Sequence, residues 1–232
     1  MSHEVKIHQI QTSILRELLF LPEARFTDLK NKTELESDHF KFHIAKLLDS
    51  GYIEKNDSGN YVLTVLGKEY ANKLDTDRNT IERQPKSAVI IVLQDGDKLL
   101  VQERLKHPYF GFWGYPGGKI RWGETIIQAA QRELLEETGL TATIVYKGVY
   151  HELVKSVETG EIIEDKIFHV VNARQPKGAM FEVFEGGRNQ WMTVDELALV
   201  EKKYTSTDLE TSVGIGQETF IEATQIYSQE EF

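Results

Sequence analysis

The chain has 232 residues, a length that suits one or two domains with a buried core. Hydrophobic residues make up 40% of it and charged residues 28%, with 5 prolines and 17 glycines, which excludes the disordered and fibrous classes. Its 27 lysines and arginines against 37 aspartates and glutamates give a net charge of -10, which argues against a protein that binds nucleic acid or acidic membranes over its whole surface.

Two absences narrow the class further. The chain has no cysteine, so disulfides, thiolate nucleophiles and cysteine zinc sites are excluded, and a cytoplasmic protein is the default expectation. The purest apolar stretch spans residues 88–93, far short of the roughly 18 residues of a membrane helix. The first residues are polar and acidic where a signal peptide is apolar, so we expect neither export nor a membrane anchor.

The first region has the pattern of a small helical domain. Apolar residues recur at helical spacing through residues 7–20. Thr27 and Ser37 are typical N-caps and predict two further helices, the second of which ends at Gly51. The buried stripe of that second helix is expected to consist of Phe40, Ile44, Leu47 and Leu48.

A hairpin and a last helix follow. Residues 52–55 and 61–64 have strand character, and the turn residues 56–59 between them favour a hairpin. Thr64 is a suitable cap for a helix over residues 65–74.

Residues 75–87 are polar, aperiodic and closed by a proline, which is typical of a linker. The expected domains are therefore residues 1–74 and 88–232, in an α+β chain of two domains. Residues 1–80 carry 11 basic and 13 acidic side chains, so most of the acidity lies in the second domain.

The order of elements in the first domain, with GYI at residues 51–53 and LTVLG at 63–67, resembles the winged helix-turn-helix domains of bacterial transcription regulators. The resemblance covers about residues 7–74. It implies that a helix over residues 38–49 enters the major groove of double-stranded DNA while the hairpin touches the backbone. The side chains implied to contact DNA are His39, Lys41, Phe42 and Lys46, with Lys30, Lys32 and Lys55 near phosphates.

The small net charge of this domain leaves a second interpretation open. Phosphate contacts supply most non-specific affinity for DNA, and a slightly acidic domain is poorly suited to them. A winged helix used for dimerisation or protein contact is the alternative. Because winged-helix regulators are commonly dimers, a homodimer is one expectation for this chain.

The second domain begins with strands and a glycine-rich loop. Residues 88–93 and 98–104 have strand character and are joined by Asp95-Gly96, a hairpin dipeptide. Five glycines between residues 111 and 123 give a backbone that can bend sharply and approach a ligand closely.

A helix with an acidic face follows the loop. Residues 125–138 are rich in helix formers, and Gly139 is suited to ending the helix. Glu133, Glu136 and Glu137 stand at i, i+3 and i+4, so one turn presents three carboxylates. Hard oxygen ligands at this spacing suit Mg²⁺ or Mn²⁺.

Arg132 lies four residues before Glu136 and can hold that carboxylate in place. Taken without its context, the acidic turn has a plainer interpretation, because a solvated acidic helix face shows the same pattern. The surrounding residues decide between the two.

Residues 118–140 resemble the Nudix box, the signature of the Nudix hydrolases. The specified positions of that motif are all filled, by Gly118, Glu124, Arg132, Glu133, Leu134, Glu136, Glu137, Gly139 and Leu140. The resemblance covers residues 85 to about 200 and implies the Nudix fold, a mixed β-sheet between α-helices, with the box as loop, helix and loop.

The resemblance also implies a metal-dependent pyrophosphohydrolase. Glu133 and Glu137 would be the main metal ligands, with Glu136 ligating or acting as base. Glu124 and the Gly117 carbonyl would support the site, and Arg132 would complete the catalytic group. Mg²⁺ or Mn²⁺ would bridge the diphosphate oxygens of a nucleotide-type substrate and help to activate water.

The general base and the substrate contacts are less defined. Glu182 and Glu185 are positional candidates for the base, although a solvated loop is the favoured interpretation of both. Arg104 is a candidate to pair with substrate phosphate, with a surface charge at the end of a strand as the alternative, and Gly118 is a further candidate for substrate binding. Stacking on a base is proposed for Phe112 and Trp113, with core packing the favoured alternative. Among further residues, Tyr109 and Phe110 are also stacking candidates, and His107, His151 and His169 receive no role.

The substrate class stays open. The first proline after the box is Pro176, too distant to match the ADP-ribose subgroup, so a nucleoside triphosphate or another nucleoside diphosphate derivative is expected, with ADP-ribose still admitted. Two functions follow: a Nudix hydrolase with an attached winged-helix domain, or a transcription regulator whose Nudix domain senses a nucleotide metabolite. The intact box and the N-terminal place of the winged helix favour catalysis.

Overall fold

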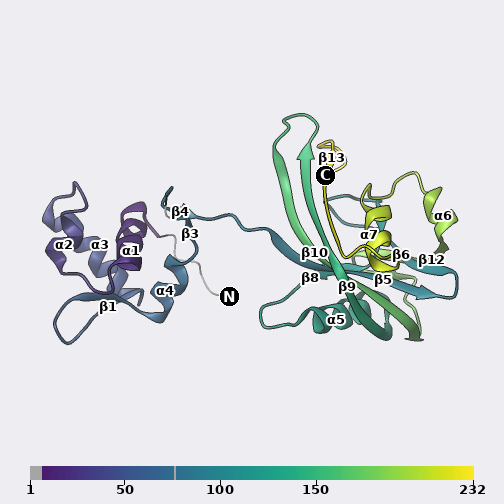
Figure 1. Ribbon diagram of the computed structural model, residues 1–232. Coiled ribbons are helices and arrows are strands. Elements are labelled where there is room, and N and C mark those ends of the chain that lie inside the picture. Colours follow the sequence, from purple (N-terminus) through teal and green to yellow (C-terminus); the bar gives the residue numbers. More distant parts are fainter. Residues whose placement is uncertain (1–6, 76) are drawn as a thin grey trace. The chain divides into compact units, whose positions relative to one another are not determined.

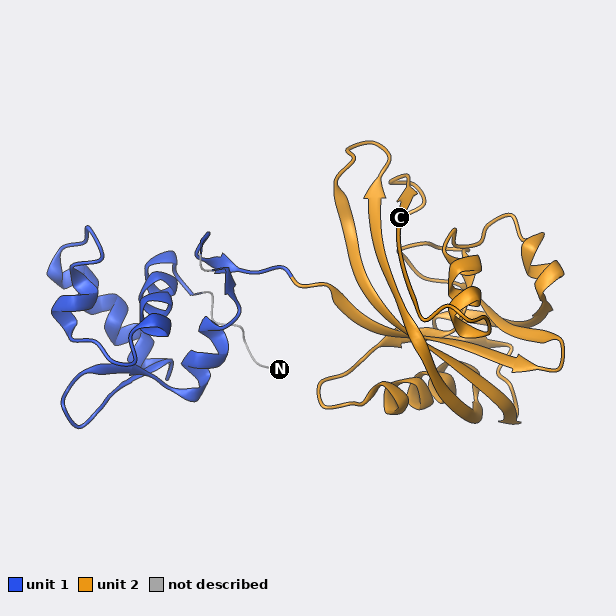
Figure 2. Ribbon diagram, in the orientation of Figure 1, with its two compact units in different colours: residues 1–83 blue, residues 84–232 orange. Residues whose placement is uncertain are grey.

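A computed structural model of the chain describes residues 7–75 and 77–232 (Figure 1). It divides into two compact units, residues 1–83 and 84–232 (Figure 2). The division falls inside the segment expected to be a linker. The start of the chain, for which we expect no export signal, lies largely outside the described residues. Among the described residues, no helix is both long and apolar enough to cross a membrane.

The first unit contains helices followed by a two-stranded hairpin and another helix. Its elements are α1 (Gln9–Phe20), α2 (Phe26–Lys30), α3 (Ser37–Asp49), β1 (Ile53–Lys55), β2 (Tyr61–Leu63) and α4 (Val65–Ala71). β1 and β2 pair antiparallel. The Thr64 hydroxyl caps α4 by accepting a hydrogen bond from the Gly67 amide at 3.0 Å, as predicted, although α4 ends at Ala71 and not at residue 74.

Two of the predicted helix starts are wrong. Thr27 lies inside α2, which begins at Phe26 because the Asp28 carboxylate accepts hydrogen bonds from the backbone and side chain of Arg25. Ser37 is the first residue of α3 and not its cap, a position held by Glu36. Hydroxyl residues near a helix start therefore indicated the helices correctly but not their first residues.

The core of the first unit forms where the helices meet the hairpin. The predicted stripe is largely confirmed, because Phe40, Ile44 and Leu47 are buried and Leu48 packs partly buried against them. Because Gly67 has no side chain, α4 can lie close to the chain that follows α3. A Cβ on Gly67 would lie 1.9 Å from the Tyr52 carbonyl oxygen.

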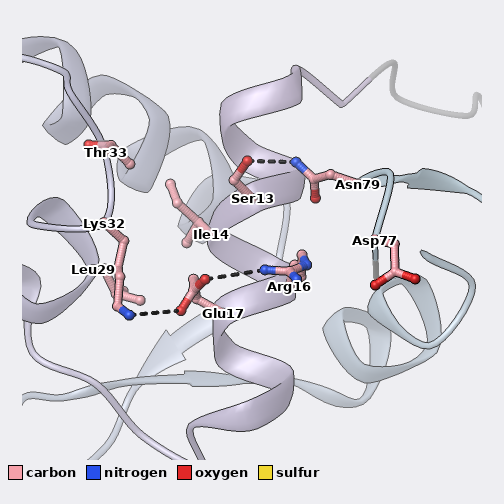
Figure 3. A pocket seen from close by; sticks show the side chains of 9 residues that line it. All are labelled: Ser13, Ile14, Arg16, Glu17, Leu29, Lys32, Thr33, Asp77 and Asn79. Carbon is pink, nitrogen blue, oxygen red and sulfur yellow. Dashed lines mark hydrogen bonds and ion pairs between the residues drawn. The ribbon is translucent and has the colours of Figure 1, made fainter. Parts of the chain in front are cut away.

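Part of the expected linker is structured. β3 (Leu74–Asp75) and β4 (Thr80–Ile81) pair antiparallel, and the Asn79 amide between them donates a hydrogen bond to the Ser13 hydroxyl of α1 at 2.6 Å (Figure 3). A cavity of about 310 Å³ adjoins this contact. Within it, Glu17 pairs with Arg16 at 3.4 Å and with Lys32 at 4.0 Å. The strands are only two residues long, too short for a visible sequence pattern.

The second unit is built on one mixed sheet. Its strands are β5 (Lys86–Asp95), β6 (Lys98–Arg104), β7 (Trp113–Gly114), β8 (Gly117–Lys119), β9 (Leu140–Ser156), β10 (Ile162–Gly178), β11 (Val183–Phe184), β12 (Gly187–Thr193) and β13 (Phe220–Tyr227). Their order is β11-β12-β6-β5-β10-β9-β13, with β7 beside β6 and β8 beside β5. β10 runs parallel to β5 and β13 parallel to β9, while the other neighbours are antiparallel.

Helices cover both faces of this sheet. They are α5 (Ile126–Thr138), α6 (Val194–Ala198) and α7 (Thr207–Gly214), with α5 and α7 on opposite sides (Figure 1). Alternate residues of β5 face opposite sides of the sheet. Val89, Ile91 and Leu93 pack with α5, whereas Ile90 and Val92 pack with Val213 of α7. This is the expected mixed sheet between α-helices.

Candidate active site

The acidic helix α5 is fixed at both ends by local interactions. The Thr125 hydroxyl caps its start by accepting a hydrogen bond from the Gln128 amide at 3.3 Å, and Gly139 ends it with a φ of 73°. Ala129, Ala130 and Leu134 are fully buried against the sheet. With this face held against the sheet, Glu133 lies against Gly118 of β8 and Glu137 against Gln102 of β6, while Glu136 is half exposed.

Arg132 holds three carboxylates of the box together. Its Nε lies 2.6 Å from Glu124 Oε1, and its Nη1 lies 2.6 Å from Glu133 Oε1 and 3.2 Å from Glu136 Oε2. Its Nη2 donates to the Lys119 carbonyl at 3.1 Å, which ties the helix to the end of β8. The guanidinium lowers the pKa of Glu124 to about 2, so this carboxylate is ionised at neutral pH.

Two glycines of β8 bring its backbone against the acidic helix and the sheet. β8 pairs with β5, with Gly118 opposite Val89. A Cβ on Gly118 would lie 2.3 Å from Glu133 Oε1, and a Cβ on Gly117 would lie 2.3 Å from the Val89 carbonyl oxygen. Only glycine at both positions leaves room for this arrangement.

Glu137 lies at the buried side of the same turn. The Gln102 side chain donates to its Oε2 at 3.2 Å, and the Gly117 backbone amide also interacts with its carboxylate. Burial raises the pKa of Glu137, and the neighbouring Glu133 raises it further. A buried carboxyl beside a second carboxylate is electrostatically suited to a bound cation.

Gln102 and Asn189 form a support that the sequence did not indicate. The two residues face each other across β6 and β12, and Gln102 Nε2 lies 3.2 Å from Asn189 Oδ1. Asn189 in turn donates to the backbone carbonyls of Glu137 and Phe181, both at 2.9 Å. The only signal for this contact is the register of two strands that lie far apart in the chain.

A cavity of about 790 Å³ opens over this site. Beside the box it is lined by Glu133, Glu137, Gly117, Gly118 and Gln102, with Lys106, Lys119 and Arg121 close by, and we call this part the box end. The remaining lining consists of Arg104, His107, Pro108, aromatic rings and the carboxyl groups of Glu152, Glu164 and Glu210, with Lys86 and Lys166.

Some of the predicted site residues line the cavity and others lie beside it. Glu133, Glu137, Gly117, Gly118 and Arg104 line it. The other three residues of the predicted catalytic and metal group, Arg132, Glu124 and Glu136, lie beside it in the ion-pair cluster. No three acidic or imidazole side chains in the described part of the chain converge as a formed metal site, since the Arg132 guanidinium occupies the space between the box carboxylates.

The structure places Phe112 and Trp113 outside the cavity, which agrees with core packing, the favoured alternative, and not with stacking on a base. Phe112 is 4% exposed and packs among Tyr109 and Tyr204, and Trp113 lies against the guanidinium of Arg188 at 5.6 Å, so neither ring lines the cavity. An aromatic residue type indicates burial without distinguishing a cavity wall from a core. Of the other candidates, Tyr109 lines the cavity and Phe110 is 48% exposed outside it.

Arg104 lies at the cavity but already has partners. Its Nε donates to the Pro108 carbonyl at 2.5 Å and its Nη2 to the His107 carbonyl at 3.4 Å, so it shapes the loop as well as adding charge. Glu182 and Glu185, the positional candidates for the base, are exposed and do not line the cavity, which agrees with the favoured interpretation of a solvated loop.

Comparisons with known proteins agree with this architecture. The NUDIX domain family model matches residues 83–211, more than half of the chain. An ADP-ribose pyrophosphatase from Methanocaldococcus jannaschii is 33% identical over 84 residues, 34% of this chain and 50% of that protein. An oxidized purine nucleoside triphosphate hydrolase from Danio rerio is 35% identical over 113 residues, 47% of this chain and 66% of that protein. The chain thus spans about half to two thirds of the length of these relatives.

A solved structure supports the fold. The crystal structure of a mutator MutT protein from Bacillus halodurans superposes with a TM-score of 0.51 at 23% identity, covering 63% of this chain and 93% of that chain. The complete box, the sheet between two helix layers and the family match together establish that the chain belongs to the Nudix family.

Proposed function

We propose that this chain is a metal-dependent pyrophosphohydrolase that cleaves the diphosphate of a nucleoside triphosphate or another nucleoside diphosphate derivative. One observation carries the proposal: the carboxylates of Glu133 and Glu137 line one cavity together with Lys106, Lys119 and Arg121, which lie beside the box. The carboxylates suit a divalent cation, and the cations suit the phosphate oxygens of a substrate. The names of the two relatives, which both describe hydrolysis of nucleotides, agree with this substrate class.

The residues of the box fit a hard divalent cation. Glu133 and Glu137 would hold Mg²⁺ or Mn²⁺, with the Gly117 carbonyl and Glu136 as further oxygen donors. The unfavourable burial of Glu137 beside Glu133 is the kind of electrostatic cost that such a cation relieves. When bound, the ion neutralises charge on the diphosphate and lowers the pKa of a coordinated water.

The chain's own residues supply positioning. Gln102 fixes one oxygen of Glu137, and Arg132 fixes Glu133 and prevents Glu124 and Glu136 from repelling it. Lys106 and Lys119 are placed to contact phosphate oxygens of the substrate at the box end of the cavity. Glu136 is assigned either as a further ligand or as the base; its side chain is 48% exposed and pairs with Arg121 and Arg132, both at 3.2 Å.

The test is release of phosphate and pyrophosphate from a panel of nucleoside triphosphates, nucleotide sugars, ADP-ribose and dinucleotides, with Mg²⁺, with Mn²⁺ and with EDTA. We expect turnover of one class that EDTA abolishes. No turnover with any compound, combined with thermal stabilisation by one of them, would contradict the hydrolase and support a ligand-sensing regulator instead.

We also propose that the first unit is a winged helix-turn-helix domain that binds DNA through α3. In support, three helices precede the antiparallel hairpin of β1 and β2, and the predicted DNA contacts on α3 are exposed. These contacts are His39, Lys41, Phe42 and Lys46, with Lys55 exposed on β1. The pairing of Lys41 with Asp38 at 3.0 Å weakens the basic character of this face.

A gel-shift assay with the chain's own promoter region tests this second proposal. Replacing Lys41 and Lys46 together by alanine should weaken binding, with a reduced dependence on salt because fewer phosphates are neutralised. An absence of binding by the wild-type protein at low salt would remove the DNA-binding role and favour a domain used for protein contact.

A further inference from the structure

The sheet of the second unit ends in two edges of very different length. One edge is β11, which has two residues, and the other is β13, which has eight and pairs only with β9 among the described strands (Figure 1). A long edge strand offers a row of unpaired backbone groups to another strand, and proteins commonly block such an edge with lysine, proline or a bulge. β13 has none of these, since its sequence is FIEATQIY and its register with β9 is unbroken.

The backbone groups on the open side of β13 belong to its even-numbered residues. The carbonyl oxygens of Thr219 and Tyr227 accept hydrogen bonds from amides at β9, both at 2.9 Å, so the odd-numbered residues point toward β9. Each residue of a strand directs its N–H and C=O to the same side, and consecutive residues alternate. The residues that direct both groups outward are therefore Phe220, Glu222, Thr224 and Ile226.

The same four residues carry the exposed side chains of the strand. Phe220 and Ile226 are 58% and 62% exposed, and Glu222 and Thr224 lie exposed between them. Their side chains share the sheet face of His151, whose Nδ1 lies 2.9 Å from Glu222 Oε1. The open edge thus has an apolar side chain at each end and two polar side chains in the middle.

We propose that β13 is the interface of a homodimer, in which the open edges of two copies pair antiparallel across a two-fold axis. A two-fold axis sets one strand against itself, so the pattern of the edge must be complementary to its own reversal. The pattern apolar, polar, polar, apolar meets this condition. The contact lies in the second unit, whereas the sequence suggested dimerisation through the first, and it does not depend on the proposed hydrolase function.

The residues of the edge select one register. Outward backbone groups of two copies meet only when even-numbered residues lie opposite one another, and a two-fold axis at Ala223 is the one position that pairs all four. It sets Phe220 opposite Ile226 of the second copy and Glu222 opposite Thr224, each pair occurring twice. The apolar side chains then meet each other, and a threonine hydroxyl can donate to the glutamate carboxylate.

The neighbouring registers are less favourable. A two-fold axis at Glu222 would set two carboxylates opposite each other, which is destabilising. An axis at Thr224 would set the Glu222 carboxylate opposite Ile226 of the second copy and leave Phe220 without an opposite residue in the strand. The complementarity of this one register favours a second copy of the chain over an unrelated strand.

The size of the contact sets the expected affinity. A stable interface buries about 800 Å² of each partner, which is more than one edge strand supplies, so we expect a dissociation constant of about 1 to 100 µM. Sedimentation velocity of the full chain between about 1 and 300 µM measures it. We expect monomers at the lowest concentration and dimers at the highest.

Thr224→Pro tests whether the open edge makes the contact. Proline removes the outward N–H of residue 224 in each copy and leaves the hydrogen bonds to β9, which the odd-numbered residues make. The dissociation constant should rise by about 10-fold or more. Circular dichroism and thermal unfolding close to those of the wild type would show that the variant is folded.

Two charge substitutions test the register and keep the proposal testable if the proline variant does not fold. Thr224→Glu sets a carboxylate opposite Glu222 of the second copy and should raise the dissociation constant by about 3-fold or more, whereas Thr224→Lys sets an ammonium there and should lower it by a similar factor. Thr143→Glu and Thr143→Lys are the controls for net charge, because Thr143 is exposed on β9 outside the stretch that pairs with β13. They should leave the dissociation constant unchanged.

The outcomes separate this interface from other modes of association. A chain that stays monomeric at about 300 µM, or a dimer that neither Thr224→Pro nor Thr224→Glu weakens, would overturn the proposal. A dimer that Thr224→Lys weakens as much as Thr224→Glu would overturn the register at Ala223, because an axis at Thr224 sets like charges opposite each other in both variants. Opposite effects of lysine and glutamate, without an effect at Thr143, would support it.

Discussion

Gly118 and Glu133 are in such close contact that a Cβ on the glycine would lie 2.3 Å from a carboxylate oxygen of the glutamate. This contact joins the end of β8 to the acidic turn of α5. The Glu133 carboxylate can take this position only because Gly118 on β8 has no side chain. The adjacent Gly117 has an equally short approach, but to the backbone carbonyl of Val89.

Replacing Gly118 by alanine should therefore reduce activity without unfolding the protein. The carboxylate is the far end of a flexible side chain and can move, so we expect a loss of unfolding free energy below about 1 kcal/mol. The displaced carboxylate should lower kcat by about 10- to 100-fold, because small misplacements in an active site are costly. Turnover assays and thermal unfolding of the same preparation would measure both effects.

Gly117→Ala is the matched comparison and, unlike Gly118→Ala, should lose stability. Its Cβ meets a strand backbone that cannot move aside, so we expect a loss of unfolding free energy of about 1 to 3 kcal/mol. If both variants lost stability equally, the explanation of Gly118 through the Glu133 side chain would be contradicted.

Glu137→Gln should abolish metal-dependent turnover while the fold stays intact. The amide keeps the size of the side chain, but it removes the negative charge proposed to bind the cation, and we expect kcat/KM to fall by about 100-fold or more. Stability should be unchanged or higher, because the buried carboxyl, whose pKa is raised by burial, is replaced by a neutral group. An unchanged rate at saturating Mg²⁺ would remove Glu137 from the proposed metal site.

Arg132→Lys tests whether the forked geometry of the guanidinium is needed. Lysine keeps the charge but cannot contact Glu124, Glu133 and Glu136 together. We expect kcat to fall by about 10- to 100-fold, as for the loss of a group that orients metal ligands. Arg188→Lys is the control, because Arg188 pairs with Glu103 at 2.5 Å away from the cavity, and its kcat should stay near that of the wild type. A similar loss in both variants would show that the effect is not specific to the box.

Local patterns predicted the parts of the site that depend on short stretches of chain. The acidic helix ends at Gly139 as expected, and the spacing of Arg132 and Glu136 does bring them together, at 3.2 Å. The strand over residues 98–104 was also predicted correctly. Each of these features is set by neighbours within a few residues, which a single sequence displays.

The remaining parts depend on segments that meet only in the folded chain. Gln102 meets Asn189 through the pairing of β6 with β12, and Glu152 meets Glu210 because α7 packs over β9. Neither pairing leaves a local signal. Phe112 illustrates a different limit, because its aromatic side chain suits a core as well as a binding surface, and only the fold decides between them.

The buried carboxyl of Glu210 gives a prediction for stability against pH. Burial and the nearby Glu152 raise the pKa of Glu210 from 4.5 to about 8 in the folded protein. Because the folded pKa is the higher one, the contribution of this group to stability is fully present below pH 4.5 and is lost as the pH rises toward about 8. Glutamine at this position does not ionise, so Glu210→Gln should gain stability relative to the wild type as the pH rises.

Urea unfolding of the two metal-free proteins at about pH 5.5 and about pH 8.5 would measure this linkage, since the groups common to both proteins cancel in the difference. The advantage of Glu210→Gln should be larger at the higher pH by about 1 kcal/mol or more, because each unit of pKa shift corresponds to about 1.4 kcal/mol. A difference that is the same at both values would mean that Glu210 is not held neutral by its surroundings.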